Sequence, residues 1–500
     1  MEDHSPIDVL ICGAGAAGLT LAIDLARRGL SFRLVDKLAA PFAGSRGKGI
    51  QPRTLEVFED LGVLTALLTV GGPYPPQRIH RADGGCDEVQ EMVVAAPTAQ
   101  EPYRTPLMVP QFATEAVLRE GLNQLGGTVE YGRELTGFDQ HVGHVVARLQ
   151  GPSGPETIAC RYLVGGDGGR SFVRKALGID FPGKTLGVRA IVADVVLEGL
   201  SRDAWHRFNE GDMARQYALC PLAGTGLFQL QAPIPLEGEV DLGAAGLQAF
   251  IEARTPGTDL VIHDVVWASA YAMNARLADR YRLGRVFLIG DAAHIHPPTG
   301  GQGLNTSVQD AYNLGWKLAA VLAGAPENLL DSYEEERRPI AAGMLGLATD
   351  LLEKARRGDM RRGREVHQLD LGYEASSLSL ETPGREDGLL AGDRAPDALL
   401  RDAAGGPVRL FDLMAGPHWT LVVRGGDAPA REGLRVVTVG EGGAFADPDD
   451  ALGRVYGLAD GDLALIRPDG YVAALVGASE RDRLTAYLDH LIPLSLREGG

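Results

Sequence analysis

The sequence predicts an α/β protein that begins with a nucleotide-binding βαβ unit. Apolar runs at residues 7–12 and 32–35 have the length of buried strands, and residues 19–28 between them carry apolar side chains at helical spacing. A glycine-rich turn joins the first strand to that helix, as in parallel sheets that bind nucleotides. The length of 500 residues adds the expectation of about three domains.

The glycine-rich turn has the Gly-x-Gly-x-x-Gly spacing of dinucleotide-binding sites, and an aspartate ends the next strand. Glycine lets the backbone approach a diphosphate, and the helix N-terminus adds partial positive charge. The Asp36 carboxylate can accept hydrogen bonds from ribose hydroxyls and would repel a 2′-phosphate, so FAD or NAD is expected rather than NADP. The residues expected to bind this nucleotide are Gly13, Gly15, Ala16, Ala17, Gly18, Asp36 and Lys37.

Sheet and helix patterns alternate through the rest of the chain. Residues 111–124 and 306–322 have helical spacing, whereas residues 128–165 alternate apolar and polar side chains as antiparallel strands do. Residues 181–275 are again strand-like. Residues 356–395 are charged and glycine-rich, which predicts a linker followed by a small α/β domain.

A second glycine-rich segment, residues 290–305, follows a short apolar strand. Its aspartate is placed to bind a ribityl chain, and its glycines allow the backbone to approach a flat ring. The helix that follows begins with N–H groups that can face the electron-rich pyrimidine edge of a flavin. The alternative is a proline-glycine surface loop. The residues assigned to the flavin here are Asp291, Pro298, Gly301, Gly303, Leu304 and Asn305.

The same segment contains His294 and His296, and a His-x-His pair can ligate a metal. No third ligand is apparent in the sequence, and the flavin interpretation already explains the segment, so no metal is expected. Gln302 is expected to lie near the flavin ring.

Residues 290–318 resemble the second FAD motif of the single-component flavoprotein aromatic hydroxylases, the FAD-dependent monooxygenases related to para-hydroxybenzoate hydroxylase and phenol hydroxylase. Residues 162–174 resemble the middle motif of that family, whose Asp-Gly pair, here Asp167 and Gly168, serves both FAD and NAD(P)H. The resemblance spans residues 7 to about 345. It is greatest to the branch that acts on phenolic polyketides and antibiotics.

The resemblance implies further roles for individual residues. Arg46 matches an arginine beside the mobile flavin, and Gln111 matches a glutamine that contacts the diphosphate–ribityl region. Leu135 falls where the family holds the adenine by backbone contacts. No catalytic acid or base is certain, and the candidates for a catalytic role are Arg46 and Pro298, the latter through its carbonyl.

The resemblance also implies a domain plan. Residues 1–180 and 276–355 would form a discontinuous, Rossmann-like FAD-binding domain, with residues 181–275 inserted as a mixed or antiparallel substrate sheet to which residues 72–105 contribute. Residues 356–395 would be a helix and linker, and residues 396–500 a thioredoxin-like domain. Because no cysteine follows Cys220, that domain lacks a Cys-x-x-Cys pair and cannot exchange dithiols.

The implied reaction is aromatic hydroxylation. NADPH or NADH would bind transiently and reduce a tightly, non-covalently bound FAD, and O2 would then form a flavin C4a-hydroperoxide that hydroxylates a phenolic or polycyclic ring. The alternatives are a small-phenol hydroxylase for phenol or hydroxyphenylpropionate, a flavin reductase or dehydrogenase, a non-catalytic flavoprotein, and an NAD-dependent dehydrogenase. The candidate substrate-lining residues are Tyr217, Phe228, Trp267 and Tyr271.

Composition argues against other classes of partner. The net charge of −18 disfavours nucleic acid and anionic membrane surfaces, and no apolar run is long enough to span a membrane. The first residues lack the pattern of a signal peptide, and the four cysteines are scattered. These features predict a cytoplasmic protein. The resemblance implies a monomer or homodimer that binds a small aromatic molecule.

Overall fold

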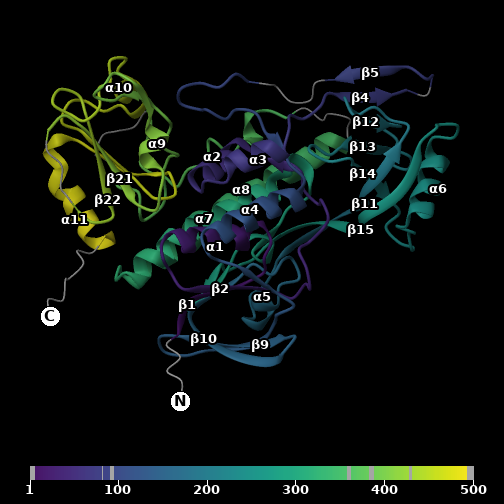
Figure 1. Ribbon diagram of the computed structural model, residues 1–500, viewed down its shortest axis with the longest axis horizontal. Helices are drawn as coiled ribbons and strands as arrows, with labels where there is room; N and C mark the ends of the chain where they lie inside the picture. The colour runs from purple at the N-terminus through teal and green to yellow at the C-terminus, as the bar shows by residue number, and fades with distance from the viewer. Residues whose placement is uncertain are drawn as a thin grey trace.

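The computed structural model describes residues 6–81, 83–89, 95–356, 362–381, 388–426 and 431–492 (Figure 1). A largely parallel sheet forms the centre of the first domain. Its strands are β1 (Ile7–Cys12), β2 (Phe32–Asp36), β7 (Val129–Tyr131), β8 (Glu134–Gln140), β9 (Val145–Gly151), β10 (Gly154–Gly165), β16 (Arg282–Leu283) and β17 (Val286–Leu288). The order is β16-β17-β10-β1-β2-β7, with β1 parallel to both β10 and β2. The ends of β1 and β10 therefore bring the first and middle glycine turns together.

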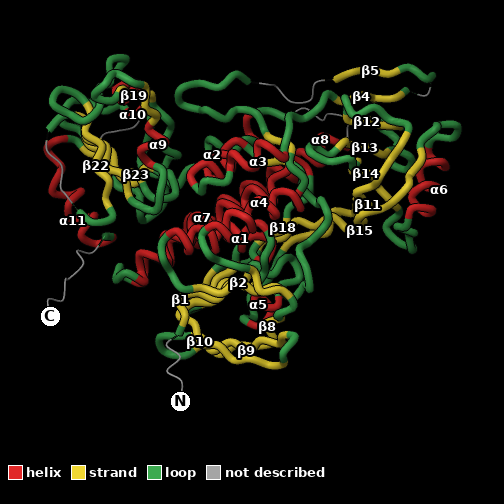
Figure 2. The backbone as a smooth tube through the Cα atoms, in the orientation of Figure 1, coloured by secondary structure: helices red, strands yellow, loops and turns green. Residues whose placement is uncertain are grey.

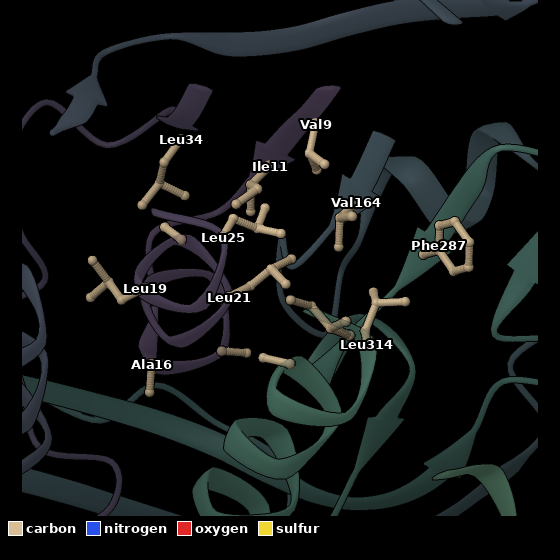
Figure 3. Close-up of a cluster of buried hydrophobic side chains, with 14 of the residues drawn as sticks. Val9, Ile11, Ala16, Leu19, Leu21, Leu25, Leu34, Val164, Phe287 and Leu314 are labelled. Carbon is tan, nitrogen blue, oxygen red and sulfur yellow. The ribbon is translucent and has the colours of Figure 1, made fainter. Parts of the chain in front are cut away.

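Helix α1 (Ala16–Arg27) lies between this sheet and α7 (Gln302–Leu322). Figure 3 shows Leu21 and Leu25 of α1 among Ile11, Val164 and Leu314, and all five side chains are fully buried. This packing fixes the glycine turn at the start of α1 close to the second glycine segment at the start of α7. The other helices of the domain are α2 (Pro52–Asp60), α3 (Leu64–Val70), α4 (Gln111–Gln124), α5 (Phe172–Ala176) and α8 (Asp331–Arg356).

A second, eight-stranded sheet stands beside the first domain (Figures 1 and 2). Its strands, in spatial order, are β18 (His294–Ile295), β15 (Val261–Leu277), β11 (Gly183–Glu198), β14 (Phe228–Ile234), β13 (Tyr217–Pro221), β12 (Trp205–Phe208), β4 (Gln77–His80) and β5 (Cys86–Val89). One face packs on α6 (Ala244–Arg254), where Ile191, Val195 and Leu247 share a core. Side chains that alternate with these point from the opposite face.

The C-terminal domain is a small α/β unit (Figure 1). Its sheet has the order β22-β21-β23-β24, in which β21 and β22 are parallel and β23 is antiparallel to both of its neighbours. This mixed arrangement is the one expected of a thioredoxin-like domain. Its elements are β19 (Leu399–Arg401), β20 (Pro407–Arg409), α9 (Leu410–Met414), β21 (Trp419–Arg424), β22 (Leu434–Val439), α10 (Ala451–Tyr456), β23 (Leu463–Ile466), β24 (Val472–Val476) and α11 (Arg481–Leu491).

Buried ion pairs fasten this domain to helices α7 and α8 of the first domain. The guanidinium of Arg467 and the ammonium of Lys317 each lie 2.6 Å from the carboxylate of Glu336 on α8. Burial alone would raise the pKa of Glu336, but the two cations hold it well below its usual range. Removing one partner from such a buried cluster is strongly destabilising, so the two domains are expected to stay docked.

Within the described ranges, no helix is both long and apolar enough to cross a membrane.

Candidate FAD site

The glycine turn between β1 and α1 leaves no room for other side chains at two positions. Gly13 has a φ of +108°, and a Cβ there would lie 2.2 Å from the carbonyl oxygen of Gly166. A Cβ on Gly18 would lie 1.9 Å from the carbonyl oxygen of Gly13. At Gly15 a Cβ would find room, because the nearest atom to it would be Glu115 Oε1 at 3.8 Å. The turn is therefore closed against the sheet and open on the side where a diphosphate would bind the N–H groups of Ala16 and Ala17.

Asp36 ends β2 beside this turn. Its Oδ2 accepts the Ala14 N–H at 2.8 Å, and its Oδ1 accepts the Leu38 N–H at 2.8 Å. Each carboxylate oxygen keeps a further lone pair for a ribose hydroxyl. Lys37 is exposed next to it. The backbone of Asp36 also receives the Arg133 N–H at 2.9 Å, which brings the nearby strand carrying Leu135 alongside the site.

A buried carboxylate on α4 lies behind the open side of the turn. Gln111, at the start of α4, donates from Nε2 to Glu115 Oε1 at 2.9 Å. Burial raises the pKa of Glu115 to about 7, although Gln111 and the Ala16 N–H oppose the rise. The backbone N–H of Gln111 donates to the Gly47 carbonyl, which links α4 to the loop that carries Arg46.

The second glycine segment forms a tight turn that opens onto the start of α7. Gly300 and Gly301 have φ values of +80° and +64°, which favour glycine, and a Cβ at Gly303 would meet no atom within 4 Å. Asn305 Oδ1 accepts the Gln51 N–H at 2.8 Å, and its Nδ2 donates to the Gly301 carbonyl at 2.7 Å. The side chain of Asn305 thus fixes the turn. The N–H groups of the first turn of α7, including that of Leu304, face out of the helix end.

Two aspartates face this region with unused capacity. The protein around the Asp291 carboxylate raises its pKa by desolvation, and the charges of His294 and Arg46 oppose that rise. Asp167 Oδ2 accepts the N–H groups of Phe172 and Val173, whereas its Oδ1 has no partner among the described residues. An orphaned oxygen, two neighbouring helix N-termini and glycines open on one side fit a dinucleotide with a diphosphate and a flat ring.

Pro298 and Gln302 lie on either side of the glycine pair. The Pro298 carbonyl accepts the Gly301 N–H at a long 3.3 Å. The Gln302 side chain is fully buried and turns back to donate to the Gly300 carbonyl at 2.8 Å. The Gln302 side chain therefore supports the turn beside the glycine pair, and its nearness to the ring stays a prediction.

His294 and His296 belong to a buried chain of hydrogen bonds under the site. His294 Nε2 lies 2.6 Å from Asp310 Oδ2, and His294 Nδ1 lies 3.0 Å from His296 Nε2. Arg337 Nε donates to the other oxygen of Asp310 at 2.9 Å. Burial lowers the pKa of His296 to about 3. Over the described ranges, no three His, Cys, Asp or Glu side chains are grouped as metal ligands.

The loop that carries Arg46 packs on the second sheet. A Cβ at Gly44 would lie 2.2 Å from the Trp267 ring, so the loop lies flat against that tryptophan. Lys48 Nζ donates to Gln229 Oε1 at 2.6 Å, and Gln229 in turn donates to the Ser45 carbonyl. Arg46 is exposed near Asp291. This loop joins residues 290–305, hereafter the flavin segment, to the second sheet.

The strand register decides which candidate substrate residues face the site. Trp267 and Tyr271 of β15 lie opposite Asp194 and Ala190, on the face that receives the Arg46 loop. Tyr217 and Phe228 point the other way, into the core shared with α6. The expectation that these two line the substrate site is therefore wrong, because side chains on a strand alternate between faces.

Family comparisons agree with this geometry. Residues 6–348 match the FAD binding domain family, and residues 389–492 match the aromatic-ring hydroxylase C-terminal family. The chain belongs to the flavoprotein aromatic hydroxylases. The matched domain family binds FAD, which identifies the cofactor of the site. The family expected from the three motifs is confirmed.

Relatives of this hydroxylase span nearly its whole length. A flavin-dependent monooxygenase from Mycobacteroides abscessus is 42% identical over 473 residues, which cover 93% of this chain and 96% of that protein. A 6-methylpretetramide 4-monooxygenase from Streptomyces rimosus is 35% identical and covers 97% of this chain and 94% of that protein. A structure of aklavinone-11 hydroxylase with FAD and aklavinone gives a TM-score of 0.84 at 29% identity, covering 98% and 100% of the two chains. The predicted α/β fold class is confirmed.

Two buried carboxylates of the hydroxylase site were not predicted from the sequence. Glu115 lies one helical turn after Gln111, and that spacing on one helix face was the available signal. Asp194 is fully buried on β11, where neither carboxylate oxygen has a hydrogen bond within the described residues. Burial raises the pKa of Asp194 to about 6, and Ser45, Lys48 and Gln229 oppose the rise. Nothing in the strand sequence indicates which loop covers this side chain.

Proposed function

We propose that this protein is an NADPH- or NADH-dependent FAD monooxygenase that uses O2 to hydroxylate a phenolic, multi-ring compound of the polyketide or antibiotic type. The observation that carries the proposal is the arrangement of two surfaces. The flavin segment and the aromatic face of the second sheet both border the Arg46 loop, which gives an aromatic substrate a wall opposite the flavin.

The wall is suited to a flat, largely apolar molecule. Trp267, Ser269 and Tyr271 project from the same face of β15, beside Val192 and Ala190 of β11. Burial raises the pKa of Tyr271 to about 12, and no neighbouring charge or hydrogen bond opposes that rise. A neutral phenol group in an apolar surrounding gains by hydrogen bonding to a polar substrate atom.

Two cations that flank this wall, Lys48 and Arg207, are already engaged by the protein. Lys48 bonds to Gln229 and lies 4.4 Å from the centre of the Trp205 ring. Arg207 lies 3.1 Å from Gln77 Oε1 and 3.2 Å from Glu210 Oε1. A substrate carboxylate would have to compete with these partners, which favours a neutral phenolic substrate.

Bound FAD would supply the electrons and the activation of O2, and the chain would supply position and enclosure. The N–H groups at the start of α7 would stabilise negative charge on the edge of a bound flavin, and Arg46 beside Asp291 would add a positive charge. The Arg46 loop and the sheet would limit the access of water to the reacting atoms.

The names of the relatives support a large substrate. They include hydroxylases of 6-methylpretetramide and of aklavinone, and both proteins align over almost the whole chain. The wall described above lies within that aligned region.

The test is a product analysis with purified, FAD-loaded protein. Phenolic polyketides should accelerate NAD(P)H oxidation and gain one oxygen atom by mass, more than simple phenols do. Hydroxylation of small phenols alone would favour the small-phenol hydroxylase. NAD(P)H oxidation that yields only hydrogen peroxide across the panel would favour a flavin reductase, and a protein that retains no FAD would refute the proposal outright.

A further inference from the structure

Gln368 has an unusual backbone for its residue type and position. Its φ is +61°, and it is one of three non-glycine residues with a left-handed backbone among the described residues. Only 2% of its surface is exposed. A side chain with a Cβ in this conformation costs free energy, so the surrounding contacts must hold it there. Such outliers point to a constraint imposed by function.

The side chain of Gln368 is bonded at both ends. Its Nε2 donates to Gln302 Oε1 at 2.6 Å, and its Oε1 accepts from Gln309 Nε2 at 2.5 Å. A third, longer bond runs from Nε2 to Thr306 Oγ1 at 3.3 Å. Gln368 therefore spans the first two turns of α7 along their buried side.

The bond to Gln302 decides which way the Gln302 amide faces. Because Gln302 Oε1 accepts from Gln368, its Nε2 is directed to the Gly300 carbonyl at 2.8 Å and the Val366 carbonyl at 3.2 Å. The opposite orientation would place two oxygens against each other. The Gly300 carbonyl also accepts from Gln51 Nε2 at 3.1 Å. The peptide that precedes the left-handed Gly301 is thus held by two side-chain donors.

This chain of bonds leads from the segment after α8 to the flavin segment. Gln368 lies outside both family matches, which cover residues 6–348 and 389–492. It does not touch the face of the turn that is open at Gly303. Its most direct link to the flavin segment passes through Gln302 and the Gly300–Gly301 peptides.

We propose that Gln368 is a positioning residue for the flavin segment: it orients Gln302, which fixes the Gly300 carbonyl and so aims the N–H groups at the start of α7. Gln368, which lies between the two family matches, then supports the FAD site. The proposal rests on FAD binding by the family and not on hydroxylation of any particular substrate.

The test compares Gln368→Gly with the wild-type full-length chain. Glycine suits the left-handed backbone, so the melting temperature of the FAD-free protein should stay within about 2 °C. Loss of the anchor should weaken FAD about tenfold in a flavin-fluorescence titration and shift the visible absorption of bound FAD. Gln368→Glu keeps the acceptor for Gln309 but cannot donate to Gln302, and it should reproduce both changes.

A matched control is available in the C-terminal domain. Asp450 has a φ of +50°, and Asp450→Gly should leave the FAD affinity and spectrum unchanged. Wild-type FAD affinity and spectrum in both Gln368 variants would overturn the proposal. A fall in the FAD-free melting temperature that matches the whole loss of FAD affinity would also overturn it, because Gln368 would then be a general structural residue. Since these readouts concern FAD alone, failure of the hydroxylation assay would not alter them.

Discussion

Two surfaces border the proposed site. The FAD cradle, formed by the two glycine segments, presents backbone groups, whereas the substrate wall on β15 and β11 presents side chains. The cradle presents backbone N–H groups at the starts of α1 and α7, and glycines decide where the cofactor can approach. The wall presents side chains such as Trp267 and Tyr271, and the strand register decides which of them face the site. The cradle is therefore set by local sequence, whereas the wall depends on pairing between distant strands.

Several side chains support the backbone of the cradle from behind. Asn305, Gln302 and Asp310 bond to glycine backbone at Gly301, Gly300 and Gly290. On the wall the polar groups are hidden instead, as with Asp194 under the Ser45 loop. A substitution in the cradle should thus disturb FAD first, and one in the wall should disturb the substrate first.

The largest effect is expected from Gly18→Ala, which tests whether the side of the cradle that faces the sheet has room for a Cβ. The new Cβ would lie 1.9 Å from the carbonyl of Gly13, so the turn must move, with a loss of at least about 4 kcal/mol in the free energy of unfolding. FAD should no longer co-purify, as flavin absorbance would report. Gly303→Ala is the matched contrast: its Cβ meets no protein atom within 4 Å, so FAD-free stability should hold while FAD affinity falls. Equal behaviour of the two variants would contradict the distinction between closed and open sides.

A smaller, pH-dependent effect is expected at Glu115, behind the cradle. Its pKa is raised from 4.5 to about 7 by burial, so the native state keeps a proton that the unfolded chain releases. The stability associated with that proton is present below pH 4.5 and is lost as the pH rises to about 7. Glu115→Gln should therefore stabilise the FAD-free protein by up to about 3 kcal/mol above pH 7 and hardly at all below pH 4.5. A stability difference independent of pH, measured by urea unfolding, would show that Glu115 does not titrate in this way.

The smallest effect on the protein itself is expected from Tyr271→Phe, on the wall. No hydrogen bond opposes the burial-driven rise in the pKa of its hydroxyl, so stability should change by less than about 0.5 kcal/mol and FAD affinity should be unchanged. The KM for the aromatic substrate should rise up to about tenfold as one hydrogen bond is lost. Tyr217→Phe is the control on the opposite face, where the hydroxyl lies 2.6 Å from Thr255. That variant should lose about 1 kcal/mol of stability and keep its KM; a raised KM in Tyr217→Phe alone would reverse the assignment of faces.

Much of the fold and of the cradle could be predicted because the signals are local. Strand β1, the glycine turn and α1 follow one another in the chain, and the Gly13 and Gly18 positions admit no other residue. Asp36 accepts a hydrogen bond from the N–H of Ala14 in the first glycine turn. Asn305 donates one to the carbonyl of Gly301 in the second glycine segment. Motif spacing therefore identified FAD and the family, since a backbone-built site leaves its constraints in the sequence.

The wall and the supports of the cradle were decided only by the tertiary structure. Tyr217 and Tyr271 look equivalent in the sequence, but strand pairing sends one to the α6 core and the other to the site. Glu115, Asp194 and Gln368 gain their roles from partners on other elements. The sequence by itself determined where a backbone must bend for FAD. Only the folded chain determined which side chains meet across it, because those contacts join residues far apart along the chain.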